Sequence, residues 1–260
     1  MAGYDTFLLG SAASLVAGLG TGLGALAIFV VRRPTAALET TLMSLAAGIM
    51  LAASVFSLLI PALEAAEPSA GPVGAGLIAS AAFLIGGGLF WLAQQHMPHG
   101  HLTTGREGQD DLEVKRLWLF VLAITIHNFP EGLAVGAGFG GDDQSRSVAL
   151  TLGILIQNMP EGFIVAAALV ALGYPHGRAF FVALLTGLVE PFGGLLGAGA
   201  VTFVAPLLPW ALAFAAGAML FVIGGAMIPE THRKGFESRA VFGLLIGFCL
   251  MVMIDQTIQL

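Results

Sequence analysis

The chain has 260 residues, of which 57% are hydrophobic and only 10% are charged, and its mean hydropathy is +0.91. A soluble globular domain carries about 25% charged residues, so this composition excludes a water-soluble protein and predicts an all-α polytopic membrane protein. Its formal net charge is −6. We expect the lipid bilayer to be a partner of this protein, and we expect no nucleic acid. The single cysteine, Cys249, excludes an internal disulfide and a cysteine metal cage.

Runs of about 20 apolar residues predict membrane-spanning helices. The first run follows the acidic Asp5, has no basic leader and is too long for a removable signal peptide. No loop is long enough to fold by itself, so residues 1–260 are predicted to form a single transmembrane domain. Eight spans are expected, at roughly 7–31, 41–63, 73–95, 116–140, 147–172, 178–203, 207–229 and 240–259.

The basic residues indicate an orientation. With eight spans, nine of the ten fall in loops or at span ends on one side of the membrane, and Arg146 alone falls on the other. The positive-inside rule assigns the basic side to the cytoplasm, so both termini are expected to face outward. The basic side holds Arg32, Arg33, Arg106, Lys115, Arg116, Arg178, Arg233, Lys234 and Arg239.

The longest loop, 96–115, lies on the predicted cytoplasmic side and has the composition of a mobile segment. Its histidines, His96, His99 and His101, leave two interpretations open, a loose metal site and a solvated linker. The linker is favoured, because a His-rich composition is a weak signal by itself.

Two nearly identical polar motifs stand inside very apolar spans. The first cassette, "HNFPEG", occupies 127–132 in the fourth span, and the second cassette, "QNMPEG", occupies 157–162 in the fifth. They place Glu131 and Glu161 well inside their spans, and "LVEPFGG" does the same for Glu190 in the sixth. An ionisable residue there costs about 2.5–3.5 kcal/mol on insertion scales. Because no Lys or Arg lies in the interior of any predicted span, where Arg116 and Arg178 are only the first residues of theirs, the carboxylates require a metal cation or shared protons.

The spacing within each cassette gathers its polar side chains. His127 and Glu131 are four residues apart, as are Gln157 and Glu161, so each pair lies on one helical face. One imidazole with amides and carboxylates suits Zn²⁺, Mn²⁺ or Fe²⁺ and suits copper(I) poorly. A lone buried His or Asn commonly just hydrogen-bonds a neighbouring helix, but two cassettes together with a third intramembrane glutamate favour a functional site.

Each cassette also carries a proline. Pro130 and Pro160 each remove one backbone hydrogen bond, and we expect them to bend their helices and free the carbonyls of Ile126 and Ile156. Such broken backbone is tolerated in a bilayer only where protein or a cavity covers it. Since the fourth and fifth spans run in opposite directions, the cassettes predict an inverted repeat with interrupted helices, which is typical of transporters.

At these residues the sequence resembles the ZIP (Zrt/Irt-like protein) family of divalent metal transporters, in its bacterial branch. The likeness covers essentially the whole chain and rests on the eight spans, on "HNFPEG" followed by "NMPEG", and on "IPETH" at 228–232. It implies a binuclear metal site at mid-membrane. The ligands implied for the first metal are His127, Glu131, Gln157, Glu161 and Met50. Those implied for the second are Asn128, Asn158 and Glu190, with Glu131 and Glu161 bridging both metals. For Met50, simple apolar packing is an equal alternative.

This chain departs from the family pattern at two places. Similar bacterial proteins carry an aspartate where this chain has Asn158, so the second metal is expected to be held less tightly. Gly225 and Ala226 stand where similar proteins place a His–Glu pair towards the cytoplasmic exit. The release route or the choice of metal is therefore expected to differ.

Charged residues at the two mouths carry weaker signals. Glu64 and Asp255 match acidic positions at the outer mouth of similar proteins, and attraction of cations is one interpretation. Glu230 and His232 lie at the predicted cytoplasmic end, where an exit role is possible and a capped helix end in solvent is favoured.

The resulting hypothesis is a transporter, not an enzyme, that imports a divalent metal into the cytoplasm. Zn²⁺ is favoured, with Cd²⁺, Fe²⁺ and Mn²⁺ as alternatives, and the metal is substrate rather than cofactor. The resemblance implies alternating access, with spans one, four, five and six moving against the rest, and a homodimer in the bacterial inner membrane. A metal-selective channel is the nearest alternative. An intramembrane metalloenzyme is a distant one, because the chain has neither HExxH nor paired Glu-x-x-His motifs.

Overall fold

A computed structural model describes residues 2–31, 34–96, 109–232 and 235–258. Within these ranges the chain is helical throughout its regular structure and has no β-strand. In chain order the elements are α1 (Ala2–Ala25), η1 (Leu26–Phe29), α2 (Ala36–Ala52), η2 (Ala53–Leu59), α3 (Ile60–His96), α4 (Gln109–Gly138), α5 (Gln144–Ala171), α6 (His176–Gly187), α7 (Glu190–Phe203), η3 (Ala205–Leu207), α8 (Leu208–Val222), η4 (Ile223–Met227), α9 (Ile228–His232) and α10 (Glu237–Ile258).

Seven helical stretches among the described residues are long and apolar enough to cross a bilayer, which makes this a multi-pass membrane protein. Most of them have 22 to 28 residues, but one has 61. The seven are Tyr4–Phe29, Ala36–His96, Leu117–Gly138, Gln144–Ala171, His176–Phe203, Leu208–His232 and Glu237–Ile258.

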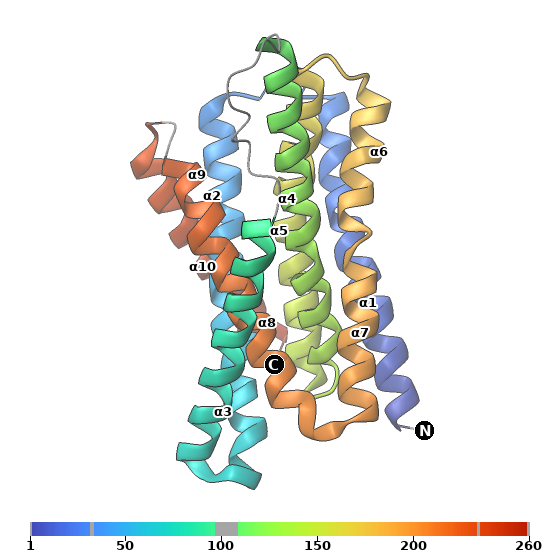
Figure 1. Ribbon diagram of the computed structural model, residues 1–260, viewed down its shortest axis with the longest axis vertical. Coiled ribbons are helices and arrows are strands. Elements are labelled where there is room, and N and C mark those ends of the chain that lie inside the picture. The colour runs from blue at the N-terminus through green and yellow to red at the C-terminus, as the bar shows by residue number, and fades with distance from the viewer. Residues whose placement is uncertain (1, 32–33, 97–108, 233–234, 259–260) are drawn as a thin grey trace.

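The 61-residue stretch folds back on itself at Gly71. A straight helix of that length would extend about 90 Å, three times the thickness of a hydrocarbon core. Gly71 has φ 68° and ψ 172°, a conformation that favours glycine, and Pro68 and Pro72 flank it. Figure 1 shows the chain reversing at the lower end of the molecule between α2 and the upper part of α3. The sequence predicted a loop here, and the helix instead continues up to the turn.

The helices form two packed groups. In Figure 1 the group on the right contains α1, α4, α5, α6 and α7, and the group on the left contains α2, α3, α8, α9 and α10. The most extensive packing lies inside the groups, with α1 against α5 and α4 against α7 in one, and α3 against α8 and α2 against α10 in the other. The groups meet chiefly where α5 contacts α2 and α4 contacts α8.

Glycines bring the backbones of the right-hand group into contact. A Cβ on Gly132, the last residue of the first cassette, would overlap the backbone carbonyl of Glu190 on α7. A Cβ on Gly162, the last residue of the second cassette, would overlap the carbonyl of Thr21 on α1. Small residues allow this close approach in membrane bundles, so each cassette ends in a helix crossing.

Irregular helical turns occur before two prolines outside the cassettes. The π-helical segments η2 and η4 end two residues before Pro61 and Pro229 respectively. A proline has no N–H for the carbonyl four residues earlier, and a wider turn accommodates that loss. We expected interrupted helices at Pro130 and Pro160, but α4 and α5 continue as α-helix through both. The neighbouring turns of a helix tolerate a single missing bond within a packed bundle.

The predicted sixth span is divided into α6 and α7. Leu188 and Val189 lie between them, and α7 begins at Glu190 with Pro191 in its first turn. Proline suits the start of a helix because the first N–H groups have no partner inside the helix. The break therefore places the Glu190 carboxylate at a helix N-terminus inside the bundle, where the helix dipole favours negative charge.

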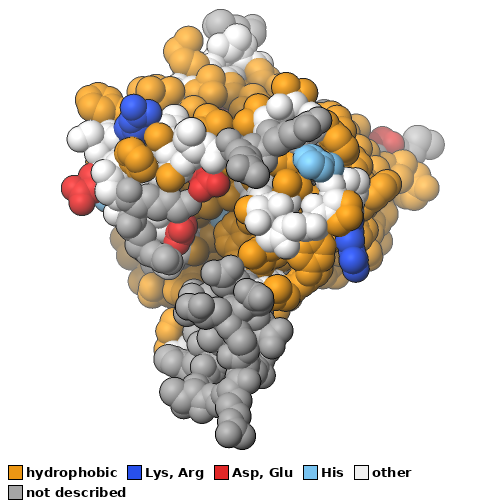
Figure 2. All heavy atoms as spheres, turned by 90° about the horizontal axis from the view of Figure 1, so that it is seen from above, with side chains coloured by type: hydrophobic (Ala, Val, Ile, Leu, Met, Phe, Trp, Pro, Cys, Tyr) orange, Lys and Arg blue, Asp and Glu red, His pale blue; other side chains and the backbone are white. Residues whose placement is uncertain are grey.

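The outer surface of the bundle is apolar. Large side chains such as Val73 on α3 and Phe203 on α7 are 79% and 81% exposed. Figure 2, which looks from the upper end, shows hydrophobic side chains around the periphery of the bundle and only scattered charged ones. Such a surface is stable against lipid tails and would be unstable in water.

Candidate metal centre

The polar residues of both cassettes lie inside the bundle. The first cassette belongs to α4 and the second to α5, and α7 presents Glu190 from its first turn. Every one of these side chains is buried, none more than 4% exposed: His127, Asn128, Glu131, Gln157, Asn158, Glu161 and Glu190.

A histidine and two glutamates form the centre of this polar region. His127 Nε2 lies 3.2 Å from Glu131 Oε1 and 3.5 Å from Glu161 Oε1. These three residues offer ligand atoms that all lie within 4.8 Å of one another, and they are the one such group found in the described part of the chain. Tetrahedral zinc with bonds of about 2.0–2.1 Å separates its ligands by about 3.3 Å, so the spacing fits a single ion.

The carboxylates of this centre lack hydrogen-bond partners. In the described structure both oxygens of Glu131 and both of Glu161 are buried without a hydrogen bond, and neither contact to His127 has hydrogen-bond geometry. Two buried anions side by side repel each other, and their desolvation is costly without compensation. A dication bound between them would supply that compensation.

The second cassette and Glu190 are joined by a chain of hydrogen bonds. Gln157 Nε2 donates to Asn158 Oδ1 at 2.9 Å. Asn158 Nδ2 donates to the backbone carbonyl of Ala17 on α1 at 2.9 Å and to Glu190 Oε1 at 2.6 Å. The chain leaves Gln157 Oε1 and Glu190 Oε2 without partners among the described residues.

The corresponding asparagine of the first cassette has a different environment. Neither the oxygen nor the nitrogen of the Asn128 amide has a hydrogen-bond partner in the described structure, although the side chain is fully buried. A buried amide normally finds partners, so an unsatisfied one at this place is a further sign that a ligand completes the centre.

Met50, the remaining predicted ligand, is buried in α2. It belongs to the large apolar cluster of the bundle core, with neighbours such as Ile49 and Ala53 in the same cluster. Apolar packing accounts for this burial, and ligation by Met50 stays a prediction.

The comparisons with known proteins concern the whole chain. The family model described as ZIP Zinc transporter matches residues 92–255. "Zinc transporter GufA" of Myxococcus xanthus is 45% identical over 96% of this chain and 98% of its own length. "Zinc transporter ZIPB" of Bordetella bronchiseptica is 44% identical over 96% of this chain and 81% of its own length. "Zinc transporter ZupT" of Chlorobium phaeovibrioides is 32% identical over 96% of each chain.

The chain belongs to the ZIP zinc transporter family. The resemblance to its bacterial branch, read from the two cassettes, is thereby confirmed.

A cavity lies beside the candidate centre of this ZIP protein. It has a volume of about 380 Å³ and extends from His127 and Glu161 to Glu230 on α9. Gly225 and Ala226 line it from the π-helical segment η4, so the two positions at which the family resemblance implied a His–Glu pair present no donor side chain to the cavity. Other lining residues escaped prediction because separate helices contribute them and no motif marks them: Met43, Phe90, Gln94 and Phe120.

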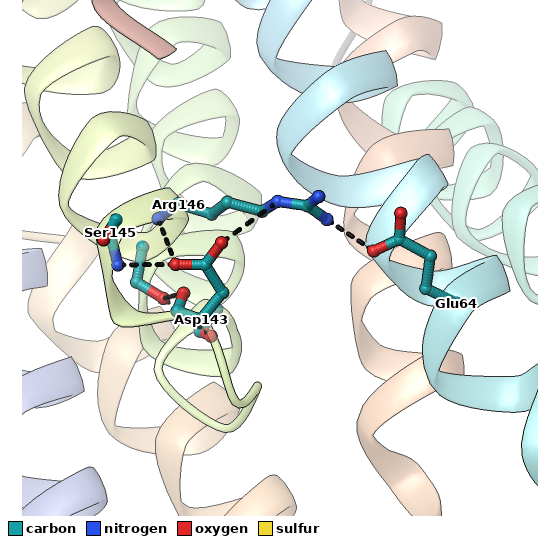
Figure 3. Close-up of polar contacts among 6 residues, drawn as sticks. Glu64, Asp143, Ser145 and Arg146 are labelled. Atoms are coloured by element: carbon teal, nitrogen blue, oxygen red, sulfur yellow. Dashed lines mark hydrogen bonds and ion pairs between the residues drawn. The ribbon is translucent and has the colours of Figure 1, made fainter. Parts of the chain in front are cut away.

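A second cavity, of about 270 Å³, opens at the opposite end. An ion pair crosses it, as Figure 3 shows. Arg146 Nη1 lies 2.5 Å from Glu64 Oε2, and Arg146 Nε lies 3.4 Å from Asp143 Oδ2. Asp143 Oδ1 also accepts hydrogen bonds from the backbone N–H groups of Ser145 and Arg146 and so caps α5.

The only signal for Arg146 in the sequence was its isolation as the single basic residue of its side.

Glu64 lines this second cavity, together with Ser57, and its place at the outer mouth stays a prediction. Asp255, by contrast, is buried in α10 rather than among the residues lining that cavity. His96 is exposed at the end of α3, where its ring nitrogen contacts the carbonyl of Leu92. His99 and His101 lie outside the described residues.

Proposed function

We propose that this ZIP protein imports a divalent transition metal, with Zn²⁺ as the favoured ion, into the cytoplasm. The observation that carries the proposal is the buried group of His127, Glu131 and Glu161, whose carboxylate oxygens lack partners and whose spacing suits one ion. The relatives named zinc transporters support zinc as the substrate rather than a resident cofactor. Cd²⁺, Fe²⁺ and Mn²⁺ share enough ligand chemistry to be alternative substrates.

We extend the proposal to the ligand set and the topology. The ligands would be His127, Glu131, Glu161 and Gln157, with Asn128 and Glu190 adjoining them and Met50 as an added donor. The turn at Gly71 would divide the 61-residue stretch into two crossings and so give a single domain of eight spans with both termini outside.

The placement of charge supports this orientation. Helices α6 and α10, which carry Arg178 and Arg239 near their starts, begin at the upper end in Figure 1, and α5, which carries Arg146, begins at the lower end. By the positive-inside rule the upper end would be cytoplasmic. The 380 Å³ cavity would then be the release route, and the structure would represent a state open to the cytoplasm.

Alternating access would move the two packed helix groups against each other. The right-hand group contains α1, α4, α5, α6 and α7, which correspond to spans one, four, five and six of the sequence hypothesis. That group carries both cassettes and Glu190, so the bound ion would travel with it. A carrier is favoured over a channel because the inner and outer cavities share no lining residue.

The family supports a proposal for the oligomeric state and the membrane of this protein. We propose a homodimer in the bacterial inner membrane, which the likeness to the bacterial ZIP branch supports. We propose no enzymatic reaction, since the relatives carry the names of transporters. The glutamate carboxylates, which can exchange a metal for protons, are the groups through which proton movement would be linked to release.

The proposal is tested by zinc uptake into proteoliposomes that contain Glu161→Ala. Removing a charged ligand from a buried site should lower zinc affinity by at least about 100-fold, so uptake at low zinc should fall to background. The matched control is Glu67→Ala, which removes an exposed carboxylate of α3 and should leave uptake unchanged. Unimpaired uptake by Glu161→Ala would rule out the proposed site. Uptake that does not saturate with zinc, accompanied by single-channel currents, would favour a channel instead.

A further inference from the structure

We infer that the mid-membrane site of this chain holds one dication rather than two, because the amide of Asn158 takes the place of a second ion beside Glu190. The inference rests on the proposed function, and it corrects the two-metal arrangement that the family resemblance implied. It makes Asn158 a positioning residue instead of a metal ligand.

The orientation of the Asn158 amide is fixed by its partners. One end of the amide lies 2.9 Å from the backbone carbonyl of Ala17, which can only accept a hydrogen bond. That end must therefore be the NH₂ group, and the same nitrogen lies 2.6 Å from Glu190 Oε1. The oxygen end then faces Gln157 Nε2, a donor, at 2.9 Å. A flipped amide would set oxygen against oxygen at two contacts.

This orientation leaves no place for a metal between Asn158 and Glu190. An amide nitrogen has two N–H groups, and here one is directed to Ala17 and the other to Glu190. A cation between Asn158 and Glu190 Oε1 would meet a donor group with a partial positive charge instead of a ligand oxygen. The Asn158 oxygen points to Gln157 and away from Glu190.

The charges in the bundle lead to the same stoichiometry. Glu131, Glu161 and Glu190 carry at most three negative charges, and no Lys or Arg of the described residues pairs with them. One dication leaves one negative charge, which Glu190 holds next to the Asn158 N–H and the N-terminus of α7. Two dications would leave an excess positive charge in a buried site, which is unfavourable. An aspartate at position 158 would bring the carboxylates to four and balance two dications.

Asn158 also orients a ligand of the remaining ion. Because Gln157 donates its Nε2 to Asn158, its oxygen is the end left without a partner. That oxygen is available as a fourth ligand beside His127, Glu131 and Glu161, and four N and O ligands are the usual number for zinc.

The test is the number of zinc ions bound by the full-length protein in detergent, measured by equilibrium dialysis with elemental analysis. We expect one ion per chain for the natural sequence and two for Asn158→Asp. Zinc X-ray absorption should show no zinc–zinc scattering in the natural protein. In Asn158→Asp it should show a zinc–zinc distance of about 3.5–4 Å. The matched control is Gln95→Glu, an amide-to-acid change at an exposed position of α3, which should still bind one ion.

The outcomes separate the inference from the proposed function. Two ions in the natural sequence would overturn the inference and leave the proposed function standing. A single ion in a folded Asn158→Asp, with folding checked by gel filtration, would also overturn it. Absence of zinc from both proteins would overturn the proposed function itself. The zinc content measured for the natural protein tests the inference even if the variant does not fold.

Discussion

The two cassettes share four of six residues and have different surroundings. In the first, His127 approaches two glutamates and the amide of Asn128 has no hydrogen-bond partner among the described residues. In the second, the amides of Gln157 and Asn158 are bonded to each other, to α1 and to α7. The difference arises from their neighbours, because the Ala17 carbonyl and the Glu190 carboxylate accept from the second asparagine. Similar motifs therefore acquire different chemistry from the helices packed against them.

The largest effect is expected from His127→Gln, which makes the first cassette resemble the second. It removes the only imidazole at the centre, so zinc affinity should fall by about 100-fold. The remaining amide and carboxylate ligands bind through oxygen, so the variant should favour Mn²⁺ more than before. Competition between zinc and manganese for the purified protein measures both effects. An unchanged zinc affinity would mean that the imidazole at position 127 contributes no more to zinc binding than an amide does.

A smaller effect in the opposite direction is expected from Gln157→His, which makes the second cassette resemble the first. A second imidazole suits zinc better than an amide, so zinc affinity should rise by about tenfold and release of zinc from the site should slow. Zinc titration gives the affinity, and single-turnover efflux from proteoliposomes gives the release rate. Gln157→Leu is the control, since it removes the amide without adding a ligand. If the histidine variant binds zinc as weakly as the leucine variant, position 157 does not face the ion.

The smallest effect is expected from Arg146→Gln in the first turn of α5, the helix that carries the second cassette. The Arg146 and Glu64 side chains are 29% and 55% exposed, and an ion pair between such groups contributes less than about 1 kcal/mol. Zinc affinity should stay within about twofold, and the midpoint of thermal unfolding should move little. Glu64→Gln and the double variant complete a mutant cycle for the pair. A large loss of zinc affinity would mean that α5 is held in place from its end and not by the contacts around its cassette.

Much of the fold was predictable because a bilayer restricts the choices. Every backbone polar group must be satisfied internally, so long apolar runs become helices, and the described residues contain seven such stretches and no strand. The reversal around Gly71 was predicted as a loop between two spans, but the break before Glu190 was not predicted, because it lies within apolar sequence that is compatible with a continuous helix. The expected interruptions at Pro130 and Pro160 were wrong, because a packed helix accommodates one missing bond.

The sequence by itself determined which polar side chains mark the candidate site. A glutamate inside an apolar span is costly, so Glu131, Glu161 and Glu190 were recognised without any knowledge of their neighbours. The tertiary structure alone decided what each polar group does. Whether an asparagine offers its oxygen to a metal or its N–H to a carboxylate depends on the atoms within about 3 Å, and these come from helices distant in sequence. Asn128 and Asn158 have the same place in their motifs, and what separates them is that Ala17 on α1 and Glu190 on α7 accept hydrogen bonds from Asn158.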